Sequence, residues 1–310
     1  MKEMVVISGK GGTGKTSLTA ALAVLSRPLA LADGDVDASD LHLLLHPRIR
    51  RREIFRSGRQ AVIRAERCTG CGLCREACRF DAIRASKDGR TFQVEPAGCE
   101  GCGVCVRQCP QQAIDFPERD GGEWFVSDTH CGPMVHARLT PGGENSGKLV
   151  ARVREEARTE ARAHGLDCIL LDGPPGIGCP VMAALTGATL ALIVTEPTPS
   201  GEHDMERVHE LTRHFNIPTA LCVNKWDINP AQTERIERRA NARGARIAGR
   251  IGYSRAMTEA LFRGRTVIEG PPSPVADEIR VIASVLIEMI GERRIAHRLG
   301  TESIPRRHGP

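Results

Sequence analysis

Aromatic residues are scarce in this chain, which has seven Phe, two Trp and one Tyr among 310 residues. Proteins that bind single-stranded nucleic acid gain much of their affinity from bases stacked on aromatic rings, so this scarcity disfavours that class. The sequence also has no apolar run of about 18 residues, the length that a membrane-spanning helix needs. We therefore expect no transmembrane segment.

Charge of either sign is not in large excess. The chain has 43 Lys and Arg against 38 Asp and Glu, a net charge of +5, and only six of the basic residues are Lys. Arginines gather at residues 48–52 and 235–243, but a run of like charge is usually a solvated face. Nucleic-acid binding would concentrate them on one element, so we expect no nucleic-acid partner.

Cysteine, in contrast, is abundant, with twelve in the chain. That number is too sparse for a small disulfide scaffold, and residues 1–9 read as the start of a strand and not as a signal peptide. We therefore expect a cytoplasmic protein, in which thiols stay reduced. Clustered cysteines in that compartment bind metal more often than they pair.

The N-terminal segment carries a phosphate-binding pattern. Residues 4–8 form an apolar run typical of a buried parallel strand, and residues 17–25 predict a helix rich in Ala and Leu. The G-x-x-x-x-G-K-T motif between them lets backbone N–H groups turn toward phosphate at the positive end of the helix. Lys15 is expected to reach the β- and γ-phosphates, and Thr16 to place its hydroxyl on Mg²⁺. The predicted nucleotide-binding residues of this loop are Gly9, Lys10, Gly11, Gly12, Thr13, Gly14, Lys15, Thr16 and Ser17.

Carboxylates follow two further predicted strands. Residues 28–32 lead into Asp33 and Asp35, and residues 168–171 lead into Asp172. Carboxylates at the carboxyl ends of strands beside a phosphate-binding loop suit Mg²⁺ and the positioning of water. Apolar runs at 190–195 and 221–223 predict two more strands. The alternation predicts an α/β fold with a doubly wound, mostly parallel sheet.

The loop also contains an early lysine, Lys10. The sequence Lys-Gly-Gly-Thr-Gly-Lys-Thr resembles the deviant Walker A loop of the P-loop ATPase class that includes MinD, ParA, Mrp and the nitrogenase iron protein. In that class the early lysine reaches across a nucleotide-sandwich dimer to the partner's phosphates. The resemblance therefore implies a homodimer in which Lys10, Lys15 and Asp35 are the catalytic residues.

Other residues match this class at their own positions. The resemblance implies that Asp33 and Asp35 form the first switch segment, that Asp172 supports Mg²⁺ and that Gly176 senses the γ-phosphate. It also implies that Asn224 contacts adenine. Residues 224–227 read Asn-Lys-Trp-Asp, which equally fits a guanine-reading pattern. We expect ATP with Mg²⁺, and GTP remains the alternative.

Eight cysteines form two runs with the same spacing, offset by 31 residues, which indicates an internal duplication. The spacing is that of bacterial two-cluster ferredoxins, in which the fourth cysteine of each run ligates the other cluster. Zinc would favour two ligand pairs per site instead. The predicted ligands are Cys68, Cys71, Cys74 and Cys109 for one [4Fe–4S] cluster, and Cys99, Cys102, Cys105 and Cys78 for the second. Arg79 stands where such ferredoxins usually have Pro, and its charge is expected to raise the potential of the second cluster.

Four cysteines lie outside these runs. Cys168 and Cys222 lie in apolar strands and are expected to be small core residues. Cys131 and Cys179 occupy positions that resemble those of the bridging-cluster cysteines of the nitrogenase iron protein. A third cluster shared between subunits is therefore an alternative, although we favour two unrelated thiols.

The cysteine runs interrupt the nucleotide-binding sequence. We predict a P-loop ATPase domain in two parts, 1–58 and 118–292, around a small α+β 2[4Fe–4S] ferredoxin domain at 59–117, with a basic tail at 293–310. The expected function is that of a dimeric, ATP-hydrolysing iron–sulfur protein that couples nucleotide state to electron transfer with an unidentified redox partner. The alternatives are an iron–sulfur carrier or scaffold of the Mrp type and a redox-sensing, MinD-like spatial regulator.

Overall fold

The computed structural model describes residues 1–140 and 145–291, which divide into two compact units. The first unit contains Met1–Arg52, Trp124–Arg138 and the chain from Ser146 onward. The second unit contains Glu53–Glu123 and Leu139–Asn145. The expected basic tail at 293–310 lies outside the described residues.

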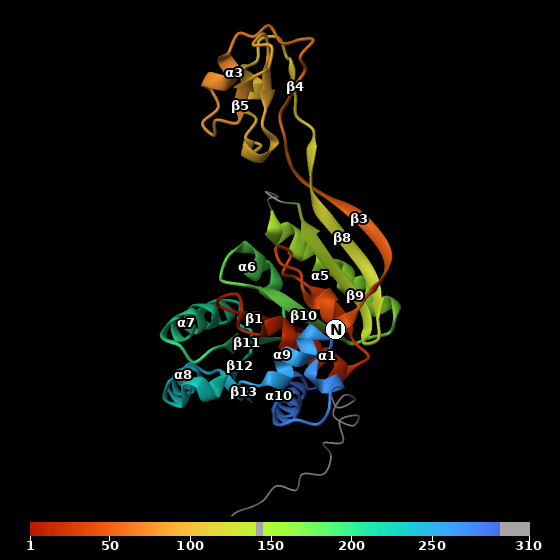
Figure 1. Cartoon of the computed structure of the whole chain (residues 1–310), viewed down its shortest axis with the longest axis vertical. Coiled ribbons are helices and arrows are strands. Elements are labelled where there is room, and N and C mark those ends of the chain that lie inside the picture. Colours follow the sequence, from red (N-terminus) through yellow and green to blue (C-terminus); the bar gives the residue numbers. More distant parts are fainter. Residues whose placement is uncertain (141–144, 292–310) are drawn as a thin grey trace, which may run out of the picture. The chain divides into compact units, whose positions relative to one another are not determined.

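A nine-stranded sheet forms the centre of the first unit, and its two last strands lead toward the cysteine segment (Figure 1). The strands in spatial order are β13 (Arg246–Ile251), β12 (Thr219–Asn224), β11 (Leu190–Thr195), β1 (Lys2–Ser8), β10 (Cys168–Pro175), β2 (Ala30–Asp33), β9 (Gly132–Leu139), β8 (Glu118–Thr129) and β3 (Arg48–Arg59). The seven strands from β13 to β9 run parallel. The predicted α/β fold with a mostly parallel sheet is therefore confirmed.

Helices cover this sheet and bury its apolar strands. They are α1 (Lys15–Ser26), α2 (Leu41–Leu45), α5 (Ser146–Ala163), α6 (Cys179–Leu185), α7 (Pro199–His214), α8 (Pro230–Ala242), α9 (Arg255–Phe262) and α10 (Pro274–Ile290), with short 3₁₀ turns at Trp226–Ile228 and Val267–Glu269. No helix of the described residues is long and apolar enough to span a membrane.

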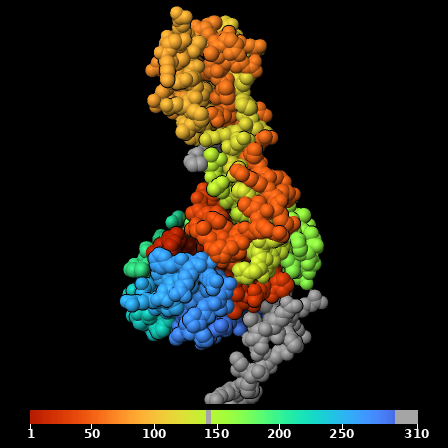
Figure 2. Space-filling model, turned by 45° about the vertical axis from the view of Figure 1, so that its right-hand side comes forward, coloured from red at the N-terminus to blue at the C-terminus, as the bar shows by residue number. Residues whose placement is uncertain are grey.

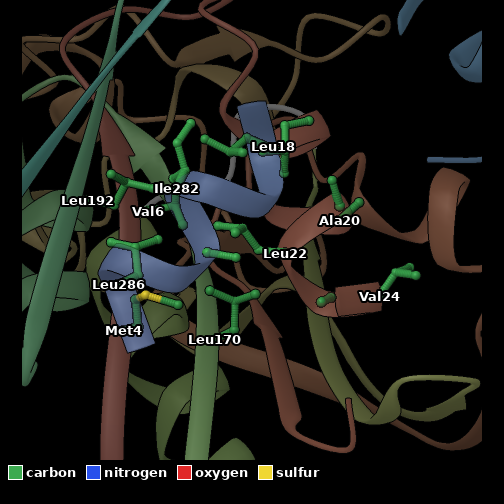
Figure 3. Packing of buried hydrophobic residues seen from close by; sticks show 14 of the residues in the cluster. Met4, Val6, Leu18, Ala20, Leu22, Val24, Leu170, Leu192, Ile282 and Leu286 are labelled. Carbon is green, nitrogen blue, oxygen red and sulfur yellow. The ribbon is translucent and has the colours of Figure 1, made fainter. Parts of the chain in front are cut away.

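Strand β1 shows why the sheet has a core. Met4 and Val6 are two residues apart, so they point to the same face, where they pack with Leu22 of α1 and Leu286 of α10 (Figure 3). Helices α5 to α8 contribute no residue to this cluster and pack against the strands from the other face. Burial on both faces explains why β1 is apolar along most of its length.

The order of the strands places the functional loops. Strand β1 leads through α1 to β2 on one side, whereas β10 leads through α6 to β11 on the other side. Ligands of such sheets bind outside the carboxyl ends of the strands where the winding direction reverses. The loops after β1, β2 and β10 meet at that edge.

The second unit repeats one small pattern. Its elements are β4 (Val62–Ile63), α3 (Leu73–Glu76), β5 (Ile83–Ala85), β6 (Phe92–Val94), the 3₁₀ turn Pro96–Gly98, α4 (Val104–Gln108) and β7 (Ile114–Asp115). Strand β4 pairs with β7 and β5 pairs with β6, both antiparallel. Gly72 and Gly103 precede α3 and α4 with φ angles of 81° and 70°, and the two positions are 31 residues apart. The duplication seen in the sequence is therefore present in the backbone.

Candidate nucleotide and iron–sulfur sites

Two glycines shape the loop between β1 and α1. Gly12 and Gly14 have φ angles of 78° and 86°, a conformation that residues with a Cβ rarely adopt. A Cβ on Gly14 would also overlap the side-chain nitrogen of Asn224. Helix α1 begins at Lys15, so its unpaired N–H groups lie at this loop. The loop therefore has the geometry of an anion site.

Lys15 is buried among carboxylates. Its Nζ lies 3.2 Å from Asp172 Oδ1 and 3.4 Å from Asp35 Oδ2. Burial by itself lowers the pKa of Lys15, but the charges of Asp172, Asp35 and Asp33 outweigh burial and raise that pKa above its usual value. Lys15 is therefore a cation at neutral pH, held where a phosphate would bind.

Asp172 lies within β10, is fully buried and accepts hydrogen bonds from two hydroxyl groups. Thr16 Oγ1 donates to Asp172 Oδ2 at 2.7 Å, and Thr19 Oγ1 donates to Asp172 Oδ1 at 3.0 Å. A hydroxyl and a carboxylate side by side supply the oxygen ligands that Mg²⁺ prefers. The sequence motif did not identify Thr19, because its contact with Asp172 depends on how α1 packs on β10.

Asp33 ends β2 and Asp35 follows it, and the two carboxylates have different surroundings. Asp35 lines the cavity beside the loop, whereas Asp33 is fully buried and does not. Asp33 accepts hydrogen bonds from Ser39 Oγ at 2.7 Å and from the Leu41 N–H at 3.2 Å. Burial and the nearby Asp172 charge raise the pKa of Asp33. Asp33 thus anchors the segment that leads into α2, whereas Asp35 lines the cavity together with Asp37 and Asp40.

A cavity of about 660 Å³ opens beside the loop. Its lining includes Gly11, Gly12, Thr13, Gly14, Lys15, Thr16, Ser17, Asp35, Asn224, Lys225, Tyr253, Met257 and Leu261. Gly9, Lys10 and Gly176 are absent from the described lining. Gly176 instead donates its N–H to the Ser8 carbonyl at 2.9 Å. Tyr253, Met257 and Leu261 belong to no motif and were missed, because only the fold brings them to the cavity.

Residues 224–227, at the end of β12, form hydrogen bonds that position the phosphate-binding loop. Asn224 Nδ2 donates to the Thr13 carbonyl at 2.8 Å, and Asn224 Oδ1 accepts from the Lys225 N–H at 3.0 Å. Asp227 Oδ1 accepts from the Tyr253 N–H at 2.7 Å, and Asp227 is not among the described cavity residues. A guanine-reading site needs that carboxylate on the base. The geometry therefore disfavours the GTP alternative.

Lys10 does not belong to the described lining of the cavity in its own chain. Its Nζ lies 3.5 Å from Glu196 Oε2, and its side chain is about one-third exposed. Lys225 Nζ lies 2.6 Å from the other oxygen of the same carboxylate. Glu196 follows β11 directly, and no sequence motif singled it out.

The cysteines of the second unit surround two cavities. One is lined by Cys68, Cys71, Cys74 and Cys109, and the other by Cys78, Cys99, Cys102 and Cys105. Each set takes three cysteines from one run and the fourth from the other run, and both groupings coincide with the predicted ligand sets. The remaining lining is largely apolar, with Ile63 and Phe92 at the first cavity and Ile83 and Val94 at the second. Four thiols around an apolar space fit a [4Fe–4S] cluster in chemistry and in number.

Burial affects the protonation of two of these thiols. Within residues 1–140 and 145–291, no group of three or more His, Cys, Asp or Glu is placed to hold one metal ion. Burial raises the pKa of Cys74 and of Cys105, and neighbouring thiols add to the effect. Each of these two thiols is therefore mainly protonated when no metal is bound, and cluster binding would release its proton.

The positions of the remaining cysteines bear on the alternative of a third cluster shared between subunits. Cys131 precedes β9 and is buried, and its carbonyl accepts from the Leu29 N–H at 3.1 Å, at the amino end of β2. Cys179 is exposed and begins α6, beyond the carboxyl end of β10. These parallel strands place the two thiols at opposite ends of the sheet, and burial raises the pKa of Cys131 to about 12. A shared cluster on Cys131 and Cys179 is therefore wrong. Cys168 and Cys222 are buried, as expected for core residues.

The arginine-rich segments are largely ion-paired. Arg50 contacts Asp128 at 2.8 Å and Glu160 at 2.5 Å. Arg239 contacts Glu202 at 3.0 Å and Glu206 at 2.9 Å on the neighbouring helix α7. Much of the positive charge is thus neutralised locally.

Comparison with known proteins agrees with both units. A family model described as a 4Fe-4S dicluster domain matches residues 61–116. The uncharacterized protein MJ0578 of Methanocaldococcus jannaschii is 32% identical over 237 residues, covering 73% of this chain and 79% of the relative. The uncharacterized protein MJ0579 of the same organism is 26% identical over 242 residues, covering 74% of this chain and 83% of the relative.

Among solved structures, the septum site-determining protein MinD of Pyrococcus horikoshii, complexed with Mg-ADP, superposes with a TM-score of 0.56. It is 18% identical, and the match covers 94% of this chain and 97% of that one. The cell division ATPase MinD of Pyrococcus furiosus has a TM-score of 0.55 and 18% identity, covering 93% of this chain and 99% of that one.

The fold and the two kinds of site define a protein with the MinD/ParA P-loop ATPase fold and a 4Fe-4S dicluster domain. Within that class, the chain belongs to the family of the archaeal protein MJ0578.

Proposed function

We propose that this protein is an ATP-hydrolysing iron–sulfur protein that acts as a homodimer and couples its nucleotide state to electron transfer through two [4Fe–4S] clusters. The observation that carries the proposal is that one chain contains both a phosphate site and two four-cysteine sites. The segment between Asp33 and Asp40 leads through α2 and β3 directly into the second unit. A nucleotide-dependent change in that segment is therefore passed along the chain toward the cysteines.

At the phosphate site, each residue has a physical role. Lys15 neutralises phosphate charge from a buried position, and the N–H groups at the start of α1 bind phosphate oxygens. Mg²⁺ would be held by Thr16 and by Asp172, and would draw charge from the phosphate oxygens. Asp35, Asp37 and Asp40 all line the cavity, and Asp35 lies 3.4 Å from Lys15 Nζ, so Asp35 is the carboxylate that orients the attacking water and accepts its proton. Asn224 fixes the loop through Thr13.

The position of Lys10 supports the proposed dimer. A cation is needed where negative charge develops at the leaving phosphate, as an arginine finger supplies in related chemistry. Lys10 is absent from its own cavity and pairs with Glu196 instead. In the proposed dimer, Lys10 leaves Glu196 and reaches the phosphates bound by the partner.

In the second unit, we propose the ligand sets that line the two cavities. Cys68, Cys71, Cys74 and Cys109 would hold one cluster, and Cys99, Cys102, Cys105 and Cys78 the other. The inserted domain is proposed to span 59–117, between ATPase segments 1–58 and 118–292. Each cluster supplies one-electron chemistry.

Coupling is tested on protein purified without oxygen. Eight irons per chain and the visible absorbance of thiolate-bound iron are expected. ATP hydrolysis is then measured with the clusters reduced and with the clusters oxidised. A rate that differs between the two states supports coupling, and equal rates contradict it.

The Lys10→Ala variant tests the dimer. We expect hydrolysis to fall by roughly 10³-fold, the lower range for loss of an arginine finger, while nucleotide binding changes little. Lys87→Ala, which removes an exposed lysine of the second unit, serves as the control. Mixing the Lys10→Ala chain with a Lys15→Ala chain should restore part of the rate, because the active site of the Lys10→Ala chain would receive Lys10 from its partner. Full hydrolysis by Lys10→Ala alone would contradict the model.

One observation favours a second function, that of a cluster carrier. Cys71 and Cys102, one in each ligand set, are exposed. Exposed ligands make a cluster easier to release. Transfer of iron to an acceptor protein lacking its cluster would favour the carrier, whereas clusters that stay bound through repeated reduction and oxidation would favour electron transfer.

A further inference from the structure

The two cysteine repeats have matching backbones but different charges. Because equivalent positions are 31 residues apart, Arg67 corresponds to Gly98 and Arg75 corresponds to Val106. At a third position the first repeat has Thr69, and the second repeat has the acidic Glu100. Residues 64–79 contain four Arg and two Glu (Glu66 and Glu76), whereas the equivalent residues 95–110 contain one Arg (Arg107) and two Glu, so the first repeat is the more basic of the two.

Two arginines lie beside the ligands of the first cluster along the chain. Arg67 directly precedes the ligand Cys68, and Arg75 lies in α3 directly after the ligand Cys74. The backbone of Arg90 approaches the same loop, since a Cβ on Gly70 would overlap the Arg90 carbonyl. In Figure 2 the residues of this first repeat, in orange, cover much of the visible surface of the second unit.

The side chains of these three arginines form no ion pair within the described residues. Arg67, Arg75 and Arg90 are exposed, and the backbone N–H of Arg90 donates to a carboxylate, Asp88 Oδ1 at 3.1 Å. Other arginines of the same unit are paired, Arg64 with Asp115 and Arg84 with Glu95 at 3.1 Å. The charge of these three arginines is therefore left for a molecule outside the chain.

We propose that Arg67, Arg75 and Arg90 form a docking surface, the Cys71 edge, for an acidic electron-transfer protein whose own redox centre is ringed by carboxylates. This rests on the proposed function, because it assigns the partner of the first cluster. Complementary charge steers such a partner and raises its association rate. The partner brings its centre to the exposed Cys71, and the electron that one protein loses is gained by the other. The second repeat lacks these charges, so its edge does not attract the same partner.

The test uses the whole protein and an acidic flavodoxin as the probe, with binding measured by surface plasmon resonance at low and at moderate salt. Arg75→Glu is compared with Arg107→Glu, which makes the same change of charge in α4, the matching helix of the second repeat. We expect Arg75→Glu to weaken binding by roughly tenfold at low salt and to reduce the salt dependence. Arg107→Glu should change binding less than about twofold.

A second measurement uses small redox probes. The protein is reduced and then oxidised by ferricyanide, an anion that takes one electron and becomes ferrocyanide. Arg67→Glu and Arg75→Glu should slow this reaction, and should speed the reaction with the cationic cobalt(III) hexaammine complex. Arg107→Glu should alter both rates less.

The outcomes separate the two proposals. If iron is bound and Arg75→Glu and Arg107→Glu weaken flavodoxin binding equally, the Cys71 edge is not the docking surface. If iron is bound and Arg75→Glu alone weakens binding, but ATP is hydrolysed at the same rate with the clusters reduced and oxidised, the surface stands and the proposed coupling fails. Loss of binding in Arg75→Glu together with full iron content supports both.

Discussion

The two units are stabilised in different ways. In the first unit, residues such as Leu22, Leu170 and Ile282 are almost fully buried, and strands and helices enclose a continuous apolar cluster. In the second unit, the buried cluster consists of Ala61, Cys74, Ile83 and Ile114, and four of the partly buried residues around it are cysteines. Five of these thirteen residues are therefore proposed cluster ligands, whereas the cluster of the first unit is almost entirely hydrocarbon.

The difference shows what each unit needs in order to fold. An apolar core of this size stabilises the first unit whether or not anything is bound. The second unit is small, and a core of four residues contributes little. The free energy of metal binding then contributes most of the stability of the second unit, as it does in other small metal-bound domains.

Removal of iron should produce the largest difference between the two units. Chelation under oxidising conditions should abolish the fold of the second unit and leave the first unit folded, because only the second draws its stability from metal. Limited proteolysis should cut within residues 53–123, whereas nucleotide binding and one cooperative unfolding transition should remain. A cysteine unit that resists proteolysis without iron would contradict this account.

Truncation of a core side chain should destabilise the first unit and leave the second unchanged. Leu22→Ala removes a buried side chain of α1 and should lower the free energy of unfolding of the first unit by about 3 kcal/mol. The visible absorbance of the clusters should not change. The control is Val281→Ala, at an exposed position of α10, with an expected loss below about 0.5 kcal/mol. Denaturant unfolding measures both.

Acid should also act on the first unit, through His136 of β9. Burial, with smaller effects from His42 and Arg138, lowers the pKa of His136 to about 4. Below pH 6.5 the unfolded chain binds a proton that the folded chain refuses, so stability falls as the pH drops from 6.5 to 4. The full loss corresponds to about 3 kcal/mol. Urea unfolding at a series of pH values measures it, and His136→Gln should give a flatter profile. Equal slopes for the two proteins would show that His136 does not titrate in this way.

The smallest effect is expected from Arg79, an exposed residue beside Cys78. Arg79→Pro removes a positive charge near one cluster, so the reduction potential of that cluster should fall slightly while the other stays constant. Protein-film voltammetry resolves the two. Identical potentials in both proteins would exclude an influence of Arg79.

Local patterns in the sequence were enough to predict much of this protein. The glycines around Lys15 and the regular spacing of eight cysteines act within short stretches of chain, so their meaning does not depend on the rest of the fold. The parallel sheet followed from alternating apolar strands and helices. The family resemblance predicted the fold in more detail, because a lysine at the position of Lys10 is specific to one class of P-loop ATPases.

Other features required the three-dimensional arrangement. Glu196 meets Lys10 only because β1 and β11 are neighbours, and the sequence places them far apart. The sequence does not distinguish the surroundings of Asp33 and Asp35. Packing determines that Asp33 is buried and that Asp35 lines the cavity. The bridging-cluster alternative failed because distance along the chain does not reveal the end of the sheet at which Cys131 lies.

Strands β3 and β8 are hydrogen-bonded neighbours in the sheet, so the chain leaves the first unit and returns to it along one ladder. A simple hairpin turn between these strands would close the same sheet without residues 60–117. We therefore expect that a β-hairpin turn at this position could replace the cysteine segment. A protein engineer could exchange it for another domain with closely spaced ends, and the nucleotide-binding fold would keep its strand order.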